Sequence, residues 1–279
     1  LLRRLNDSDA DIFLDRAEGL SRILNEKFFE SDRYVRAVTD AGRVIGSVAD
    51  EEGKIYIEPQ GWALFSGVAD RGKAAKILSA VKRELYVPYG VLLLSPPYTR
   101  YHEDICRITN DSPGLVENGS NYVHGSLFFA YGLARAGYPD ESYDILCRIL
   151  PANLENPPER SFLEAFRVTN SYRGPGARHP GRAMFSWRTG AAGWFIKTVW
   201  DGLLGIRPDF DYLEIDAHIP KAFGESFIAT RQVRGRAIKF FFQKGGGTSK
   251  SRTNCIEVRN GAKINYSELS KVSSIIIKY

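Results

Sequence analysis

Apolar residues recur at helical spacing through the first two thirds of the 279-residue chain. The segments that share this pattern, and are therefore expected to be helices, are residues 9–29, 60–86, 121–136, 141–150, 160–168 and 191–204. Ser8 is the expected N-cap of the first. The second is expected to break near residues 69–72, and the third is apolar on nearly all sides, which is typical of a buried helix.

Beyond about residue 207 the hydrophobic period falls to two, which predicts strands. The alternating or apolar segments are residues 212–216, 227–233, 236–243, 255–258 and 274–278. Glycines at 245–247 predict a turn, and Asn260–Gly261 predicts a two-residue hairpin. Helices followed by strands, rather than alternating with them, predict two segregated parts, residues 1–206 and 207–279.

Composition narrows the possible functions. The net charge is +5, but the basic residues are spread without a block of like charges, so nucleic-acid binding is not expected. No apolar run approaches the roughly 20 residues that a membrane helix needs. Cys106, Cys147 and Cys255 form no Cys-x-x-Cys pair, so neither a disulfide framework nor a metal site is predicted, and the cytoplasm is the expected compartment.

Small residues between two tryptophans mark the first candidate site. The segment Trp187 to Trp194 reads Trp-Arg-Thr-Gly-Ala-Ala-Gly-Trp, and it leads into the expected helix 191–204. Thr189 is either the N-cap of that helix or, with Gly190, a phosphate ligand acting through its hydroxyl group and nearby N–H groups.

A polar loop before the buried helix marks the second candidate site. His124 lies near the start of helix 121–136 and is either a hydrogen-bonded core histidine or a ligand of phosphate or sugar. Glu117, in the loop before it, either caps a helix or binds a sugar hydroxyl group. A helix N-terminus offers free N–H groups and partial positive charge, which suit an anion.

Together these motifs resemble the C-terminal portion of the inverting disaccharide phosphorylases of glycoside hydrolase family 94, such as cellobiose, cellodextrin and chitobiose phosphorylases. The resemblance spans roughly residues 30 to 240. Its motifs are Gln60-Gly61-Trp62-Ala63, Pro113-Gly114 with Glu117-Asn118-Gly119, Trp187 to Trp194, and Leu204-Gly205-Ile206-Arg207-Pro208.

The resemblance implies an α+β multidomain fold. Residues 1–206 would form half of an (α/α)6 toroid, and residues 207–279 a C-terminal antiparallel β-sheet or sandwich domain. It implies phosphorolysis of a β-linked glucosyl disaccharide or oligosaccharide with inversion, giving α-glucose 1-phosphate, with inorganic phosphate as co-substrate and no cofactor. His124, Thr189 and Gly190 match phosphate-binding positions, and Glu117 a sugar-binding one. Asn170 matches a second sugar-binding position more loosely, because residues 164–170 depart from the family pattern.

The family's general acid, an Asp in an Asp-Trp-Asn-Asp type motif, has no counterpart in this chain and is expected upstream of Leu1. The chain is therefore expected to associate with the N-terminal half of the enzyme, and a homodimer is the second association considered. Two alternatives remain open: a non-catalytic carbohydrate-binding or scaffold relative, and an (α/α)6 glycoside hydrolase that uses water.

Overall fold

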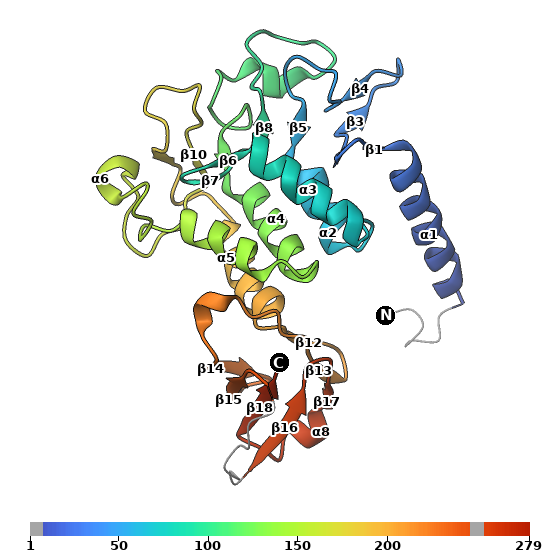
Figure 1. Ribbon diagram of the computed structural model, residues 1–279, viewed down its shortest axis with the longest axis vertical. Coiled ribbons are helices and arrows are strands. Elements are labelled where there is room, and N and C mark those ends of the chain that lie inside the picture. The colour runs from blue at the N-terminus through green and yellow to red at the C-terminus, as the bar shows by residue number, and fades with distance from the viewer. Residues whose placement is uncertain (1–7, 246–253) are drawn as a thin grey trace.

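The computed structural model describes residues 8–245 and 254–279. Figure 1 shows a larger part rich in helices and, below it, a smaller part built of strands. The glycine turn expected at 245–247 lies mostly outside the described residues.

The larger part contains α1 (Ala10–Lys27), α2 (Ile57–Phe65), α3 (Arg71–Glu84), α4 (Val123–Arg135), α5 (Pro139–Arg148), α6 (Pro158–Ser161) and α7 (Ala191–Lys197), which continues as the π-helix η3 (Thr198–Leu203). The break expected near residue 70 is confirmed: Asp70 caps α3 by accepting from the Lys73 N–H group at 2.8 Å. The N-cap of α1 is Asp9, so the prediction of Ser8 was wrong by one residue. The helix expected over 160–168 was also wrong, because Phe162 ends α6 in the left-handed region at φ 54°.

The centre of this part is α4, which is buried along most of its length as its composition predicted. It packs against α2 at unusually close range. A Cβ atom on Gly61 would lie 2.9 Å from the Phe129 nitrogen, and one on Gly132 would lie 2.8 Å from the Gly61 oxygen. Only glycine allows this approach of two helix backbones, and α2 and α4 are therefore in close contact at the middle of each helix.

Two-residue strands connect the helices, and the sequence did not predict them because two residues show no period. They are β1 (Phe29–Glu30), β2 (Arg33–Tyr34), β3 (Ala37–Val38), β4 (Val44–Ile45), β5 (Ile55–Tyr56), β6 (Tyr86–Val87), β7 (Gly90–Val91), β8 (Leu94–Ser95), β9 (Asn121–Tyr122), β10 (Ser171–Tyr172) and β11 (Ala183–Met184). Among them, β11, β10 and β9 form one antiparallel sheet. This sheet joins segments far apart in the sequence around the start of α4.

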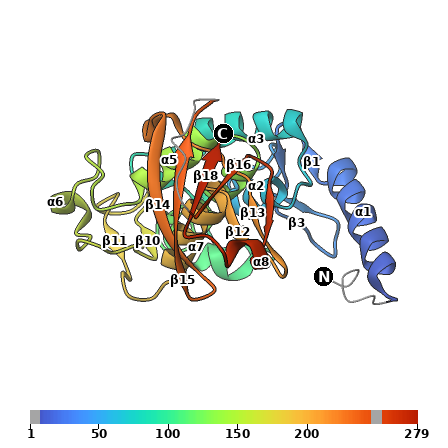
Figure 2. The same ribbon diagram turned by 90° about the horizontal axis from the view of Figure 1, so that it is seen from below.

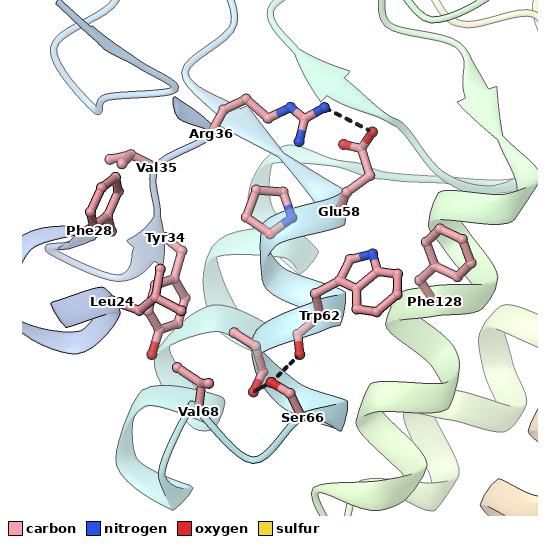
Figure 3. A pocket seen from close by; sticks show the side chains of 12 residues that line it. Leu24, Phe28, Tyr34, Val35, Arg36, Glu58, Trp62, Ser66, Val68 and Phe128 are labelled. Atoms are coloured by element: carbon pink, nitrogen blue, oxygen red, sulfur yellow. Dashed lines mark hydrogen bonds and ion pairs between the residues drawn. The ribbon is translucent and has the colours of Figure 1, made fainter. Parts of the chain in front are cut away.

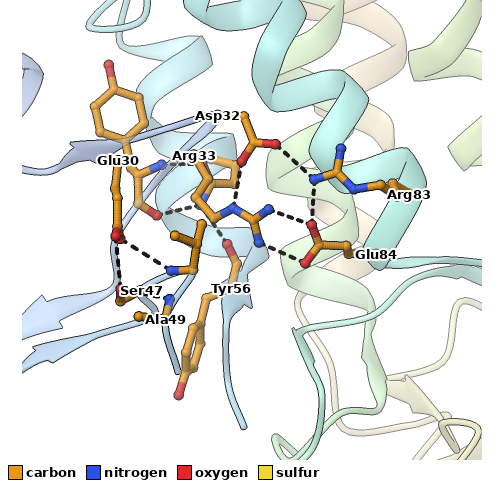
Figure 4. A network of polar contacts seen from close by, with 11 residues as sticks. Glu30, Asp32, Arg33, Ser47, Ala49, Tyr56, Arg83 and Glu84 are labelled. Atoms are coloured by element: carbon orange, nitrogen blue, oxygen red, sulfur yellow. Dashed lines mark hydrogen bonds and ion pairs between the residues drawn. The ribbon is translucent and has the colours of Figure 1, made fainter. Parts of the chain in front are cut away.

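A buried arginine joins β2 to the end of α3 (Figure 4). Arg33 is 3% exposed, and its two terminal nitrogens donate to both oxygens of Glu84 at 2.8 and 2.5 Å. Its Nε donates to Asp32 at 2.8 Å, and Arg83 contacts the other Asp32 oxygen at 2.8 Å. Because every charge in this cluster has an opposite partner, the buried guanidinium group is compensated and holds β2 in place.

The first helix, α1, stands at the margin of the molecule in both views (Figures 1 and 2). Leu24 and Phe28 at its C-terminal end pack against the main core. Its other large apolar side chains are exposed: Ile12, Phe13, Leu14, Leu20 and Ile23. The prediction of a helix with an apolar stripe was therefore correct, but no part of residues 8–245 or 254–279 covers most of that stripe. No helix of the described residues is long and apolar enough to cross a membrane.

The smaller part contains β12 (Ile206–Pro208), β13 (Tyr212–Ile215), β14 (Ser226–Val233), β15 (Arg236–Gln243), β16 (Cys255–Arg259), β17 (Lys263–Asn265), α8 (Tyr266–Leu269) and β18 (Ser274–Lys278). One sheet has the order β12-β13-β17 and the other β14-β15-β18-β16. Their apolar residues share one core. The first strand of the smaller part, β12, begins at Ile206, whereas the second part was predicted to begin at residue 207.

The expectation of an antiparallel β domain was wrong for the larger sheet, because β18 runs parallel to both β15 and β16. Ile275, Ile276 and Ile277 of β18 are buried in succession, which is typical of a central strand in a parallel arrangement. The hairpin expected at Asn260–Gly261 was wrong too. The chain turns there, but the Asn260 amide group bonds the backbone of Ala217, and β17 pairs with β13 of the other sheet.

Candidate functional site

The starts of α4 and α7 lie next to each other and carry the predicted phosphate ligands. His124 is the second residue of α4, and Gly190 is the N-cap of α7. A Cβ atom on Gly190 would lie 3.2 Å from His124 Nε2, so the glycine leaves this nitrogen uncovered on one side. The structure therefore brings these two predicted residues together.

The environment of His124 favours a neutral ring. Burial lowers the pKa of the His124 imidazole below its usual value of 6.5. Its ring stacks on that of Tyr122 with centroids 5.9 Å apart, and Nδ1 is buried without a hydrogen-bond partner among the described residues. A buried ring nitrogen without a partner costs free energy, so the core-histidine interpretation, which requires a satisfied ring, is disfavoured.

Thr189 lies one residue before the N-cap rather than at it. Its Oγ1 accepts a hydrogen bond from the Ala191 N–H group at 3.0 Å. A hydroxyl group that accepts in this way still has an O–H donor for another acceptor. The two interpretations of Thr189, helix start and ligand, are therefore compatible.

Asn170 joins the two helix starts. Its carbonyl oxygen accepts from the Val123 N–H group at 2.9 Å, next to His124. Its side-chain Nδ2 donates to the carbonyl oxygen of Arg188 at 3.0 Å, next to Thr189. This one residue therefore sets the spacing between the segments that carry His124 and Thr189. Its assignment as a sugar ligand stays a prediction.

Glu117 lies in a loop that other residues hold in place. The buried Asn118 side chain donates to the carbonyl oxygens of Tyr98 and Asp111 at 2.8 and 2.7 Å. Glu117 itself is only partly exposed, and Arg107 donates to its carboxylate group at 3.5 Å. The Asn118 side chain therefore holds the loop in place, and the Glu117 carboxylate group remains accessible to a ligand.

The loop 171–181 packs against the loop that carries Glu117. Gly174 N–H donates to the Gly114 carbonyl oxygen at 2.8 Å. A Cβ atom on Gly174 would overlap the carbonyl oxygen of Gly119. Contact this close requires glycine, so the glycine-rich loops before and after the site are packed together rather than independent.

The two tryptophans of the small-residue segment have different roles. Trp194 is half-buried and packs edge-on against Phe128, with centroids 4.6 Å apart. Trp187 is 70% exposed and is covered on one face by the Arg167 guanidinium group, 3.2 Å from the ring centroid. Only Trp194 belongs to the packed interior beside His124.

A cavity of about 580 Å³ lies beside the site, and the sequence did not predict it (Figure 3). It is lined mainly by apolar side chains of α1, α2 and α4 and by the charged pair Arg36 and Glu58. Burial, and to a smaller extent the charge of Glu117, raise the pKa of the Glu58 carboxyl group, while Arg36 acts in the opposite direction. The feature of the sequence analysis that falls at this cavity is the Gly-Trp pair at 61–62, which recurs at 193–194.

A metal centre is not formed within residues 8–245 and 254–279, where no group of three or more His, Cys, Asp or Glu side chains could hold an ion. The described site combines helix starts, the carboxyl groups of Glu58 and Glu117 with their arginine neighbours, and a partly apolar cavity. Such groups can position an anion against a sugar.

Comparison with known proteins agrees with these features. The chain is 38% identical to a solabiose phosphorylase of Paenibacillus borealis over 76% of this chain and 28% of that protein. It is 29% identical to a cellobionic acid phosphorylase of Neurospora crassa over 90% of this chain and 32% of that protein. The chain thus spans about a third or less of the length of these relatives.

A solved structure named as a sialidase shares the fold at a TM-score of 0.57 and 15% identity, covering 87% of this chain and 22% of that chain. This likeness concerns the fold alone. The sequence profile described as the glycosyl hydrolase 94 superfamily, catalytic domain, matches residues 2–205. The match covers most of the chain and all of the predicted site residues, and the chain therefore belongs to the glycosyl hydrolase 94 superfamily.

Proposed function

We propose that the protein containing this chain catalyses phosphorolysis of a β-linked glucosyl disaccharide or oligosaccharide with inversion, releasing α-glucose 1-phosphate. The observation that carries the proposal is the contact between His124 and Gly190 at the adjoining starts of α4 and α7. Membership of the family and the phosphorylase names of the two relatives support it.

Phosphate is already an anionic nucleophile, so the reaction needs no general base. It needs the anion held in line with the anomeric carbon, on the face opposite the bond to be broken, and an acid that protonates the leaving oxygen. His124, Thr189 and Gly190 would hold the anion with pre-oriented donors. Glu117 and Asn170 would orient the sugar.

The acid is proposed to come from outside this chain, together with the rest of an (α/α)6 barrel. The exposed apolar stripe of α1 supports this association, because an apolar stripe of this length normally packs against another surface. The chain's share of its relatives' length is consistent with it.

The test is phosphate dependence. Full-length protein would be incubated with a panel of β-linked disaccharides, with and without inorganic phosphate, and sugar 1-phosphate release followed. The proposal expects product only with phosphate. Release of free sugar without phosphate would instead identify a hydrolase, and binding of sugar without any turnover a non-catalytic relative.

Phosphate binding is expected to take up protons between about pH 5 and 7. In the free protein burial lowers the His124 pKa below its usual value of 6.5, which favours the neutral ring. A bound phosphate anion would raise that pKa, because an opposite charge stabilises the imidazolium form. Calorimetry in buffers of different ionisation enthalpy measures the uptake. Subtracting the result for His124→Asn removes protons exchanged by phosphate itself, and a difference of zero would contradict the assignment.

A further inference from the structure

The helices α2, α4 and α7 repeat one arrangement in their first turns. On each, an aromatic residue follows four positions after a residue at the helix start: Trp62 after Glu58, Phe128 after His124, and Trp194 after Gly190. The Phe128 ring lies between the other two, with centroids 5.6 Å from Trp62 and 4.6 Å from Trp194. The three aromatic residues are therefore at one level of the packed helices.

Residues four apart on a helix lie on the same face. Glu58, His124 and Gly190 therefore lie together at the starts of the helices, one turn before the three aromatic residues. The chain enters α2 and α4 in the same way, since Tyr56 and Tyr122 each end a two-residue strand and act as the N-cap. Glu58 is the second residue of α2, as His124 is the second residue of α4.

Glu58 is not satisfied within the described chain. Its Oε2 is shielded from solvent and has no hydrogen-bond partner among the described residues, and its Oε1 lies 4.0 Å from the nearest Arg36 nitrogen. Figure 3 shows these two side chains pointing toward each other at one end of the cavity, above Trp62. An ion pair this long and partly exposed contributes little, so it does not explain a carboxyl group at this place.

The surroundings of Glu58 suit a sugar better than phosphate. An ionised carboxylate group near Glu117 would repel an anion, whereas a sugar hydroxyl group can donate a hydrogen bond to it. Trp62, which is 49% exposed, offers an apolar surface one turn away from the carboxyl group. A polar group beside an indole face is the combination that binds the two kinds of surface of a sugar ring.

We propose that Glu58 is a further substrate-binding residue, whose carboxyl group hydrogen-bonds a hydroxyl group of a sugar in the cavity beside Trp62. This inference rests on the proposed function. Under it, Glu58 at the start of α2 binds the sugar, while His124 at the start of α4 and Gly190 at the start of α7 bind phosphate.

The test uses the full-length enzyme and calorimetric titration of disaccharide in the absence of phosphate. For Glu58→Leu the dissociation constant is expected to rise about 10- to 100-fold, the range for losing a hydrogen bond to a carboxyl group. Glu58→Gln, which keeps a hydrogen-bonding side chain of the same shape, is expected to stay within about 10-fold. The KM for phosphate should not change in either. Glu141→Leu, at the start of the outer helix α5, is the matched control.

A set of deoxy-disaccharides keeps the inference testable if Glu58→Leu folds poorly. In wild-type protein, removal of the bonded hydroxyl group should weaken binding, and in Glu58→Gln that penalty should shrink. Unchanged penalties at every hydroxyl position, or unchanged affinity in Glu58→Leu, would overturn the inference and show that Glu58 packs against another protein segment. Wild-type protein that binds disaccharide but shows no phosphorolysis would refute the proposed function alone.

Discussion

Replacing His124 by alanine is expected to lower kcat/KM for phosphate by about 100- to 1000-fold in the full-length enzyme, the loss typical of removing one pre-oriented donor to an anion. The dissociation constant for disaccharide should stay nearly the same, because the ring lies against Gly190 at the phosphate side of the site. Initial rates over a grid of phosphate and disaccharide concentrations separate the two effects.

His218→Ala is the matched control, since that ring contacts Asp216 in the β domain, away from the starts of α4 and α7. It should keep wild-type kinetics. An unchanged phosphate KM together with unchanged kcat in His124→Ala would remove His124 from the phosphate site.

Gly174→Ala is expected to lower kcat/KM for disaccharide by about 100-fold, although residue 174 carries no chemistry of its own. The added methyl group would overlap the Gly119 carbonyl oxygen, so the loop that carries Glu117 must move. A displacement of about 1 Å in a substrate-positioning group can cost a factor of this size. The same kinetic grid measures it, and crystallography of the variant would show the displaced loop.

Gly72→Ala is the matched control, because a methyl group at residue 72 has room. There a Cβ atom would meet only the Asp70 carboxylate group, at 3.3 Å, in the exposed first turn of α3. Its activity should equal that of the wild type. If Gly174→Ala also kept wild-type activity, the packing of the two loops would not matter for the position of Glu117.

Helical periodicity predicted α1 to α5 and α7 well, because each has an apolar face at a spacing of three to four residues. It failed at α6, where the left-handed conformation of Phe162 stops the helix, and no composition signal marks that conformation. In the β domain, alternating or apolar segments predicted β13, β14, β15, β16 and β18, but this pattern missed the three-residue strands β12 and β17 and did not give the strand directions. The continuous apolar run at residues 275–277 is typical of a central parallel strand, but a run this short indicates only a strand and not its direction.

The candidate site was predicted as residues, not as an arrangement. The sequence placed His124 and Gly190 at helix starts, and the family resemblance gave them a common ligand, but their contact depends on the close packing of α4 beside α7. Glu58 was missed because it lies before the helical segment predicted over residues 60–86, whereas α2 begins at Ile57. Glu58 lines the cavity together with Arg36 and with Leu24 of α1, and this neighbourhood does not show in the sequence around residue 58.

The double attachment of Asn170 has a consequence for how such a site can diversify. Its carbonyl oxygen holds the start of α4 and its side chain holds the backbone before Thr189. A substitution here that altered sugar preference would also alter the distance between His124 and Thr189. Changes of substrate through residue 170 are therefore expected to be epistatic with the proposed phosphate-binding residues His124 and Thr189.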